Sequence, residues 1–430
     1  MPASADVIGH LDRHHASLRE TFRVWRDVGD LRQNRTGVIE DYFEQVNLGD
    51  VQRLGANSVA LSRRRAPDYA PTALIIGSHD TGSLTPVDLD TITAAEEMHS
   101  PGSGSLLGST VAFLEGFKAT VTSTLEEPIQ LHAISVGPGD TVLDVVDSID
   151  TDKVDVVFFT NAVAWDPLHP TMTTGSRGRL EAEITLQVTR AINDTAYAGV
   201  TRNPMNRLLE LVADLRGDNG RIAIPGFYER AVPPERGAFD ELSTDWLTTI
   251  GATPLGGSLS PIERSTQWPV ISVLSVSDSE PGDASIPRHA TARVAIHLVP
   301  DQRPVAIEQA LRAWLTEQIP DNVHGSVKIS SASRPYRCTQ DTPAFAAQVR
   351  ALHRVHGRSA LPVPGGGPPG AGEVHYATGA PVMFAGICGP SERWGTSSEL
   401  LSQELFDNGT QVAAETCLQL TRRTTLRSTS

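Results

Sequence analysis

The sequence predicts an α/β fold into which a smaller α+β domain is inserted, and three stretches of the chain carry this prediction. Residues 129–136 and 154–160 are continuous apolar runs, which are typical of strands buried on both faces of a parallel or mixed sheet. From Leu180 the pattern changes to alternation of apolar and polar residues, which indicates a half-exposed antiparallel strand. From Arg334 the first pattern returns. We therefore expect a discontinuous α/β domain, 1–177 with 334–430, and an inserted domain at 178–333.

The elements of the first domain follow from apolar periodicity and from the Gly and Pro residues that interrupt it. Val7, Leu11, Leu18 and Phe22 stand at helical spacing and predict an opening helix over 5–30. Strands then alternate with helices, as in layered α/β proteins. The expected elements are strands at 58–62 and 73–77, a helix at 105–119, strands at 129–136 and 154–160, a helix at 343–356, a Gly/Pro-rich loop at 364–372, a strand at 382–386 and a last helix ending near 423.

The inserted domain has a different order of elements. Asn203-Pro204 is a typical helix start, because proline is well tolerated in the first turn, and the helix should end near 215. Residues 218–268 are rich in Gly, Pro and charge and predict an irregular crossing. Strands at 270–276 and 291–298, a helix at 305–318 and a strand at 326–330 complete a β-α-β-β-α-β order, the split βαβ arrangement.

Composition excludes several classes of partner. The chain has 430 residues and a formal net charge of -15, and it has no Lys/Arg stripe that could neutralise phosphates, so no nucleic-acid partner is expected. It contains no run of about 18 apolar residues, so no membrane span is expected. The three cysteines, Cys338, Cys388 and Cys417, are far apart and odd in number, which fits a reducing compartment. A cytoplasmic protein is the expectation.

The stretch LIIGSHDTGSL at 74–84 holds the first candidate site. A short apolar run ends in Gly-Ser-His-Asp, so a buried strand would deliver Ser78, His79 and Asp80 to the edge of the sheet. Metal hydrolases often carry a His-x-Asp pair at such a strand end, whereas here the His and Asp are adjacent. Consecutive residues on a strand point to opposite faces, so these three cannot form a hydrogen-bonded Ser/His/Asp relay among themselves. His79 is either a packed imidazole or a catalytic base.

A series of landmarks then matches a known family in order and spacing. The segments are 73–86, PTMTTGSRG at 170–178, YAGVTRNP at 197–204, GRIAIPGFYE at 220–229, 286–302 and GGGPP at 365–369. From about residue 10 to 425 the chain resembles the M20 metallopeptidases, which include carnosinase-like dipeptidases and related deacylases. The resemblance implies a catalytic-type α/β domain, a mixed sheet flanked by helices, with an inserted α+β lid that also serves as a dimerisation domain.

The resemblance also implies a two-zinc site, held in the family by two His, a bridging Asp, a Glu and an Asp, with a further Glu as general base on the metal-bound water. The residues of this chain at those positions are unexpected. In chain order the family's positions fall on Ser78, on Ser105 or Leu106, on Val136-Gly137, on Asn161 and on Gly395, while the family's lid His falls on Asn193 and its substrate-carboxylate Arg on His297. Only Asp80 and Glu399 keep the family's residue type. We therefore expect no metal and no other cofactor.

Three functional hypotheses remain. The first is a repurposed, metal-independent enzyme that acts on an amino-acid-like or peptide-like small molecule, with His79, Asp80 and Glu399 as its catalytic groups. Its substrate contacts would be Arg393, Asn161, Asn193, His297, Ser78 and Trp394, and we expect Trp165 and Trp394 to fill part of the emptied cleft. The second is a non-catalytic relative that binds such a ligand or a catalytic partner. The third is an M20 amidohydrolase with atypical metal ligands, which the fixed spacings from Asn161 to Pro170 and from Asn193 to Pro204 disfavour.

One macromolecular partner is implied by the resemblance. The exposed strand and helix of the inserted domain resemble the family's dimerisation surface, so a homodimer through the lid is expected.

Overall fold

The computed structural model describes most of the chain. The described residues are 9, 31–63, 70–80, 97–99, 103–123, 129–148, 154–166, 170–189, 194–217, 221–231, 246–247, 259–278, 285–319, 323–394 and 399–427. The predicted helix at 5–30 therefore lies outside them but for one residue. By its contacts the chain divides into two compact units, one of Met1–Gly175, Phe239–Pro261 and Arg337–Ser430 and the other of Ser176–Ala238 and Ile262–Tyr336. Residues 239–261, which the sequence assigned to the inserted domain, group with the first unit.

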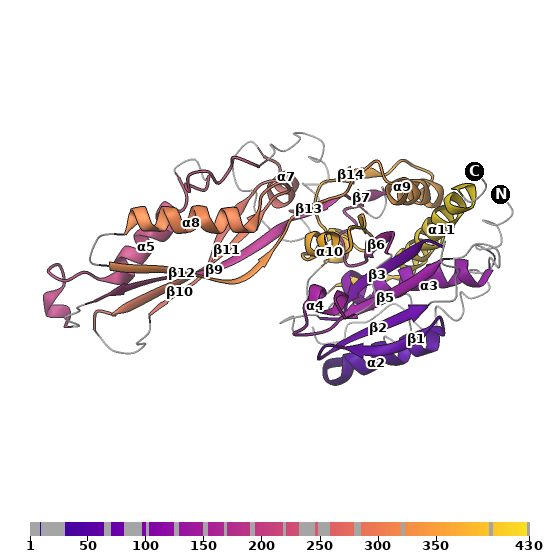
Figure 1. Cartoon of the computed structure of the whole chain (residues 1–430), viewed down its shortest axis with the longest axis horizontal. Helices are drawn as coiled ribbons and strands as arrows, with labels where there is room; N and C mark the ends of the chain where they lie inside the picture. Colours follow the sequence, from indigo (N-terminus) through magenta and orange to yellow (C-terminus); the bar gives the residue numbers. More distant parts are fainter. Residues whose placement is uncertain are drawn as a thin grey trace. The chain divides into compact units, whose positions relative to one another are not determined.

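The first unit is built on a mixed six-stranded sheet (Figure 1). Its strands are, in spatial order, β1 (Asp50–Leu54), β2 (Ser58–Arg63), β5 (Gln130–Val136), β3 (Thr72–Ser78), β6 (Val156–Phe159) and β15 (Val382–Phe384). Strands β5, β3, β6 and β15 run parallel, while the β1–β2 and β2–β5 pairs are antiparallel. The continuous apolar runs of the sequence are these central strands, which are buried on both faces as a parallel sheet requires.

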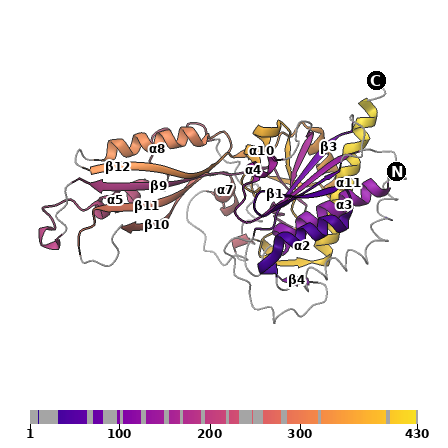
Figure 2. The same ribbon diagram turned by 60° about the horizontal axis from the view of Figure 1, so that its bottom comes forward.

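Helices lie on both faces of this sheet (Figure 2). They are α2 (Leu31–Val46), α3 (Ser109–Ser123), which follows a π-helical turn at Ser103–Gly108, α4 (Val142–Val146), α9 (Pro343–His356), α10 (Ala371–Thr378) and α11 (Gln403–Arg427). The bounds of α9 match the sequence prediction because both ends are capped. The Thr342 side chain accepts a hydrogen bond from the Phe345 N–H, and Gly357 ends the helix at a φ of 68°.

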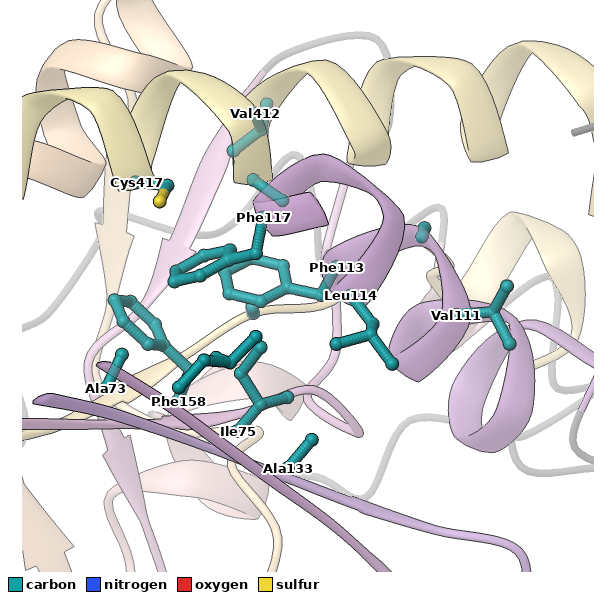
Figure 3. Close-up of a cluster of buried hydrophobic side chains, with 14 of the residues drawn as sticks. Ala73, Ile75, Val111, Phe113, Leu114, Phe117, Ala133, Phe158, Val412 and Cys417 are labelled. Carbon is teal, nitrogen blue, oxygen red and sulfur yellow. The ribbon is translucent and has the colours of Figure 1, made fainter. Parts of the chain in front are cut away.

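The core of the first unit lies between the sheet and the α3–α11 pair (Figure 3). Ala73 and Ile75 point to this face, and the alternate residues of β3, Leu74 and Ile76, are equally buried but do not belong to this cluster. Phe113 and Phe158 meet with their ring centroids 5.2 Å apart. Short ladders complete the unit: β7 (Thr171–Thr173) with β14 (Leu361–Val363), β4 (Glu97–His99) with β16 (Leu400–Ser402), and β8 (Gly175–Ser176) with β13 (Tyr336–Arg337).

The second unit is a four-stranded antiparallel sheet covered on one face by two helices (Figure 1). In chain order its elements are β9 (Gly178–Val188), α5 (Pro204–Asp214), β10 (Val270–Asp278), β11 (His289–Leu298), α8 (Pro304–Gln318) and β12 (Val323–Ser333), with the sheet order β10-β11-β9-β12. This confirms the predicted β-α-β-β-α-β order. A short helix, α7 (Pro261–Thr266), and a 3-10 turn at Thr195–Tyr197 were not predicted.

Helix α5 packs on β11 and β9, and α8 packs on β12 and β9. Every second residue of β9 is buried beneath them, which is the alternation that the sequence shows from Leu180. No helix in the described part of the chain is both long enough and apolar enough to cross a membrane.

Candidate functional site

The carboxyl ends of three parallel strands bring the predicted positions to one edge of the first unit's sheet. Ser78 at the end of β3 is opposite Val136 at the end of β5. On the other side of β3, the Thr160 N–H donates to the Ile76 carbonyl at 2.9 Å, which places Asn161 directly beyond the same edge. Ligands of open α/β sheets gather at this edge, so it is the candidate site of the first unit.

The Ser78 hydroxyl forms two hydrogen bonds with backbone groups at the end of β3. Its Oγ donates to the Val136 carbonyl at 3.1 Å and accepts from the Asp80 N–H at 3.1 Å, which forms a tight local turn. The turn leaves the Asp80 side chain exposed. Ser78 therefore shapes the edge, and Asp80 is its exposed acidic group.

His79 points away from the edge and into the protein, with none of its surface exposed. Its Nδ1 lies 2.9 Å from the Ser135 Oγ, and its Nε2 lies 3.4 Å from the Thr36 Oγ1. The Thr36 hydroxyl gives its proton to the Asn57 carbonyl at 3.0 Å, so it accepts from His79 Nε2, and Nδ1 accepts from Ser135. This geometry favours the packed alternative for His79 over the catalytic one. Sequence reasoning missed Thr36 and Ser135, since neither carries a motif.

Asn161 presents an unusual group at the edge. The residue is partly buried, and its Oδ1 is buried without a hydrogen-bond partner. An unsatisfied buried acceptor costs about 1–3 kcal/mol. A donor group that reached this oxygen after a small side-chain movement would recover that cost.

The segment 390–399 contributes the other predicted residues of this unit. Arg393 ends a 3-10 turn with a φ of 57° and is exposed, and Trp394 beside it is partly buried against the core, with its Nε1 buried and unpartnered. Glu399 is fully buried. Burial raises the pKa of the Cys388 thiol well above its usual range, and the nearby Glu399 and Glu392 carboxylates add to that rise. Cys388 is thus an inert buried thiol.

Trp165 packs beneath the Gly-rich loop of the first unit. Its Nε1 donates to the Gly365 carbonyl at 3.1 Å, and its ring meets Trp246 edge-on at 5.4 Å. A Cβ at Gly366 would come within 2.8 Å of the Trp165 ring nitrogen, so this glycine allows the close approach. Trp165 is thus packed tightly against the loop at Gly365 and Gly366.

In the second unit, two arginines, Arg177 and Arg179, lie near His297. His297 pairs with Arg179 across β11 and β9. Burial lowers the pKa of His297 to about 4, with the positive charges of Arg177 and Arg179 adding to the effect. Desolvation also lowers the pKa of Arg177 to about 10. Among the described residues Arg177 has neither a hydrogen bond nor an ion pair, and the neighbouring Ser176 Oγ is buried without a partner.

A guanidinium that is partly desolvated and has no counter-ion is a natural anion site. Arg179 is less available, because it forms an ion pair with Glu181 at 2.5 Å. Arg177 was not among the predicted site residues, although it stands in the quoted segment PTMTTGSRG. The desolvation of its guanidinium could be learned only from the structure. Asn193, the other predicted contact in this unit, lies outside the described residues.

The depressed pKa of His297 predicts an acid-sensitive stability. Between about pH 6.5 and about pH 4 the unfolded chain binds a proton at His297 that the folded protein does not, so stability should fall as the pH drops through this window. After allowance for the partly exposed ring, we expect a loss of about 1–2 kcal/mol. The measurement is urea unfolding at both ends of the window, in the parent and in His297→Gln. The variant should lose less stability on acidification, and equal losses in the two proteins would refute the assignment.

The described residues offer no group of three or more His, Cys, Asp or Glu side chains that could hold a metal ion. Glu373 and His375, which stand two positions apart on α10, accordingly have no third ligand within the described ranges. Gly395 and the side chain of Ser105 belong to the parts of the chain outside these ranges.

Comparison with known proteins identifies the class. Residues 174–323 match the peptidase dimerisation domain of the M20 family. A probable di- and tripeptidase of Saccharomyces cerevisiae, DUG2, is 23% identical over 233 residues, which are 53% of this chain and 24% of that protein. The matched region thus spans about a quarter of the length of this curated relative.

Solved structures extend the likeness to the whole fold. The M20 metallo-carboxypeptidase Sso-CP2 of Sulfolobus solfataricus superposes with a TM-score of 0.73 at 18% identity, over 90% of this chain and 94% of that one. Human carnosine dipeptidase 1 gives 0.71 at 17% identity, over 97% and 99%. Most of the second unit therefore matches the M20 peptidase dimerisation domain, and the chain as a whole has a fold similar to that of M20 peptidases.

Proposed function

We propose that this M20 peptidase-like protein has lost the two-zinc centre and binds an amino-acid-like or peptide-like ligand without metal. The observation that carries the proposal is the set of residues at the strand ends of the first unit. A two-zinc site needs several anionic or imidazole donors. The described positions offer a hydroxyl at Ser78, no donor side chain at Val136 and Gly137, and a neutral amide at Asn161.

The lack of space around Gly137 is a second observation that supports this proposal. A Cβ built on Gly137 would lie 2.0 Å from the Asn57 carbonyl oxygen, so no carboxylate side chain fits there without a shift of the backbone. The Ser78 hydroxyl is also held by its two hydrogen bonds within the turn. The residues at the strand ends are thus packed against and hydrogen-bonded to neighbouring protein atoms, and they do not fit a pair of zinc ions.

The charges that remain suit a zwitterionic ligand. Asp80 and Arg393 are exposed groups of opposite sign in the first unit, and they match an ammonium and a carboxylate respectively. In the second unit, Arg177 is largely desolvated and has no ion pair among the described residues, so it suits a carboxylate by itself. These are the chemical groups of an amino acid or a short peptide.

Binding is favoured here over catalysis. Of the three predicted catalytic groups, His79 and Glu399 are fully buried, and His79 has both ring nitrogens engaged by hydroxyls. Only Asp80 is exposed as a possible acid or base. A location in the cytoplasm stays a prediction.

Calorimetric titration with alanylalanine and with leucine tests the proposal. Asp80→Asn and Arg393→Ala should each weaken binding of a zwitterion by about tenfold, since each removes one charge-assisted contact. Arg312→Ala is the matched control, because Arg312 is exposed on α8 and paired with Glu308. Equal affinities in the parent and in all the site variants would show that these residues do not form the site.

We also propose that the protein is a homodimer that joins through the edge strand β10 and the neighbouring helix α5. Strand β10 pairs only with β11 within the described sheet, and its outer half is exposed. The exposed apolar side chains of this face are Val273, Leu274 and Val276 on the strand and Leu209 on α5. An apolar, unpaired strand edge is a surface that another strand would complete.

A further inference from the structure

A small cavity in the first unit lies apart from the candidate site. Its volume is about 60 Å³, and its walls come from α3, the segment after β6, α9, the end of β15 and the start of α11. None of Ser78, Asp80, Asn161, Arg393 or Glu399 lines it. The cavity therefore has its own wall chemistry and needs its own explanation.

The interior of this cavity is largely apolar, and its polar lining includes two side chains that can accept from an ammonium, Asp166 and Gln348. Phe113, Leu352 and Val412 are among the buried side chains of the wall. Asp166 is the one acidic side chain of the lining, and burial lowers the pKa of His356, the one imidazole there. A carboxylate beside an apolar cavity attracts a cation that carries an alkyl group.

Gln348 adds a second acceptor to the wall. It is 3% exposed, and its Nε2 donates to the Phe384 carbonyl at 2.5 Å. This bond fixes the orientation of the amide, and the Oε1 atom is left buried without a partner. A buried acceptor without a donor is uncommon in folded proteins, and it marks a place where a donor from a bound molecule would be stabilising.

We propose that this cavity is an accessory binding site for a small primary aliphatic amine in its ammonium form. The ammonium is held by the Asp166 carboxylate, with Gln348 Oε1 as a further acceptor, and the alkyl group packs against the apolar wall. A volume of about 60 Å³ is roughly that of two water molecules in the liquid, so the buried group is an alkyl chain of about two carbons. The proposal is independent of the zwitterion site.

Titration with ethylammonium, followed by protein NMR, tests this site. We expect saturable binding with a dissociation constant of about 1–10 mM, as suits a ligand of so few atoms. Ethanol has a similar shape and no charge, so it should bind more weakly and with equal affinity to the parent and to Asp166→Asn. The Asp166→Asn variant should bind ethylammonium about fivefold more weakly than the parent.

A second variant tests the cavity itself. Ala164 lines the cavity, and Ala164→Leu places three more carbons in it, so this variant should show no saturable binding of the amine. Equal affinity of the amine for the parent and for Asp166→Asn would overturn the proposal. The absence of saturable binding to the parent below about 100 mM, which would leave the cavity to water alone, would overturn it as well.

Discussion

Replacement of Phe158 by alanine should lower the free energy of unfolding by about 3–5 kcal/mol. Phe158 stands on the central strand β6 and is fully buried, and its ring lies 5.2 Å from that of Phe113 and 5.8 Å from that of Phe117. Figure 3 shows these three rings between the sheet and the helices α3 and α11. Removal of the Phe158 ring leaves a cavity in the middle of this cluster, and the packed neighbours on both sides cannot close it.

The measurement is urea unfolding followed by circular dichroism. Tyr376→Ala is the matched control, because it removes an aromatic ring of the same unit that is 75% exposed. The control should change stability by less than about 0.5 kcal/mol, as surface substitutions usually do. A loss for Phe158→Ala no greater than that of the control would contradict the described core.

A charge on the outer edge of β10 should separate the proposed dimer into monomers. Leu274 stands at an irregularity in the β10–β11 register, so it and the preceding Val273 are both exposed, at 47% and 46%. Leu274→Lys places an ammonium where the partner strand would pack. Since buried interface anchors contribute about 2 kcal/mol or more, the dimer should dissociate at concentrations at least roughly 30-fold higher than for the parent.

Light scattering across a range of micromolar concentrations gives the test. Val305→Lys is the control, because Val305 is a 64% exposed apolar residue on α8, which packs over β12 at the other side of the sheet. The parent and the control should be dimers, and Leu274→Lys a monomer. A monomeric parent, or a variant that stays dimeric, would show that the β10 edge is not the interface.

Most of the fold could be predicted from the sequence where periodicity was long or ends were capped. The eleven-residue alternation of β9 and the capped helix α9 are such cases. The ladders β7–β14 and β4–β16 were missed, since their strands have three residues each and are too short to show a period. Helix α7 was also missed, because it has six residues and lies at the end of a Gly/Pro-rich stretch.

The candidate site was predictable in position but less so in chemistry. The resemblance to M20 peptidases implied that Ser78, Val136 and Asn161 lie at one site, and in the structure they stand at the same edge of the sheet. The burial of His79 could not be predicted, because it depends on Thr36, which is 43 residues away in the chain. The lowered pKa of His297 likewise depends on its burial and on the nearby Arg177 and Arg179, which could not be predicted from the sequence.

Elemental analysis for zinc is the most direct test of the proposed loss of the metal centre. The purified protein is incubated with excess zinc, desalted and analysed, together with Asn161→Ala. The strand ends of the first unit lack the donors that a tight site requires, so the parent should retain well below one equivalent and match the variant. Retention of about two equivalents by the parent, lost in Asn161→Ala, would contradict the proposal and identify a working two-zinc site.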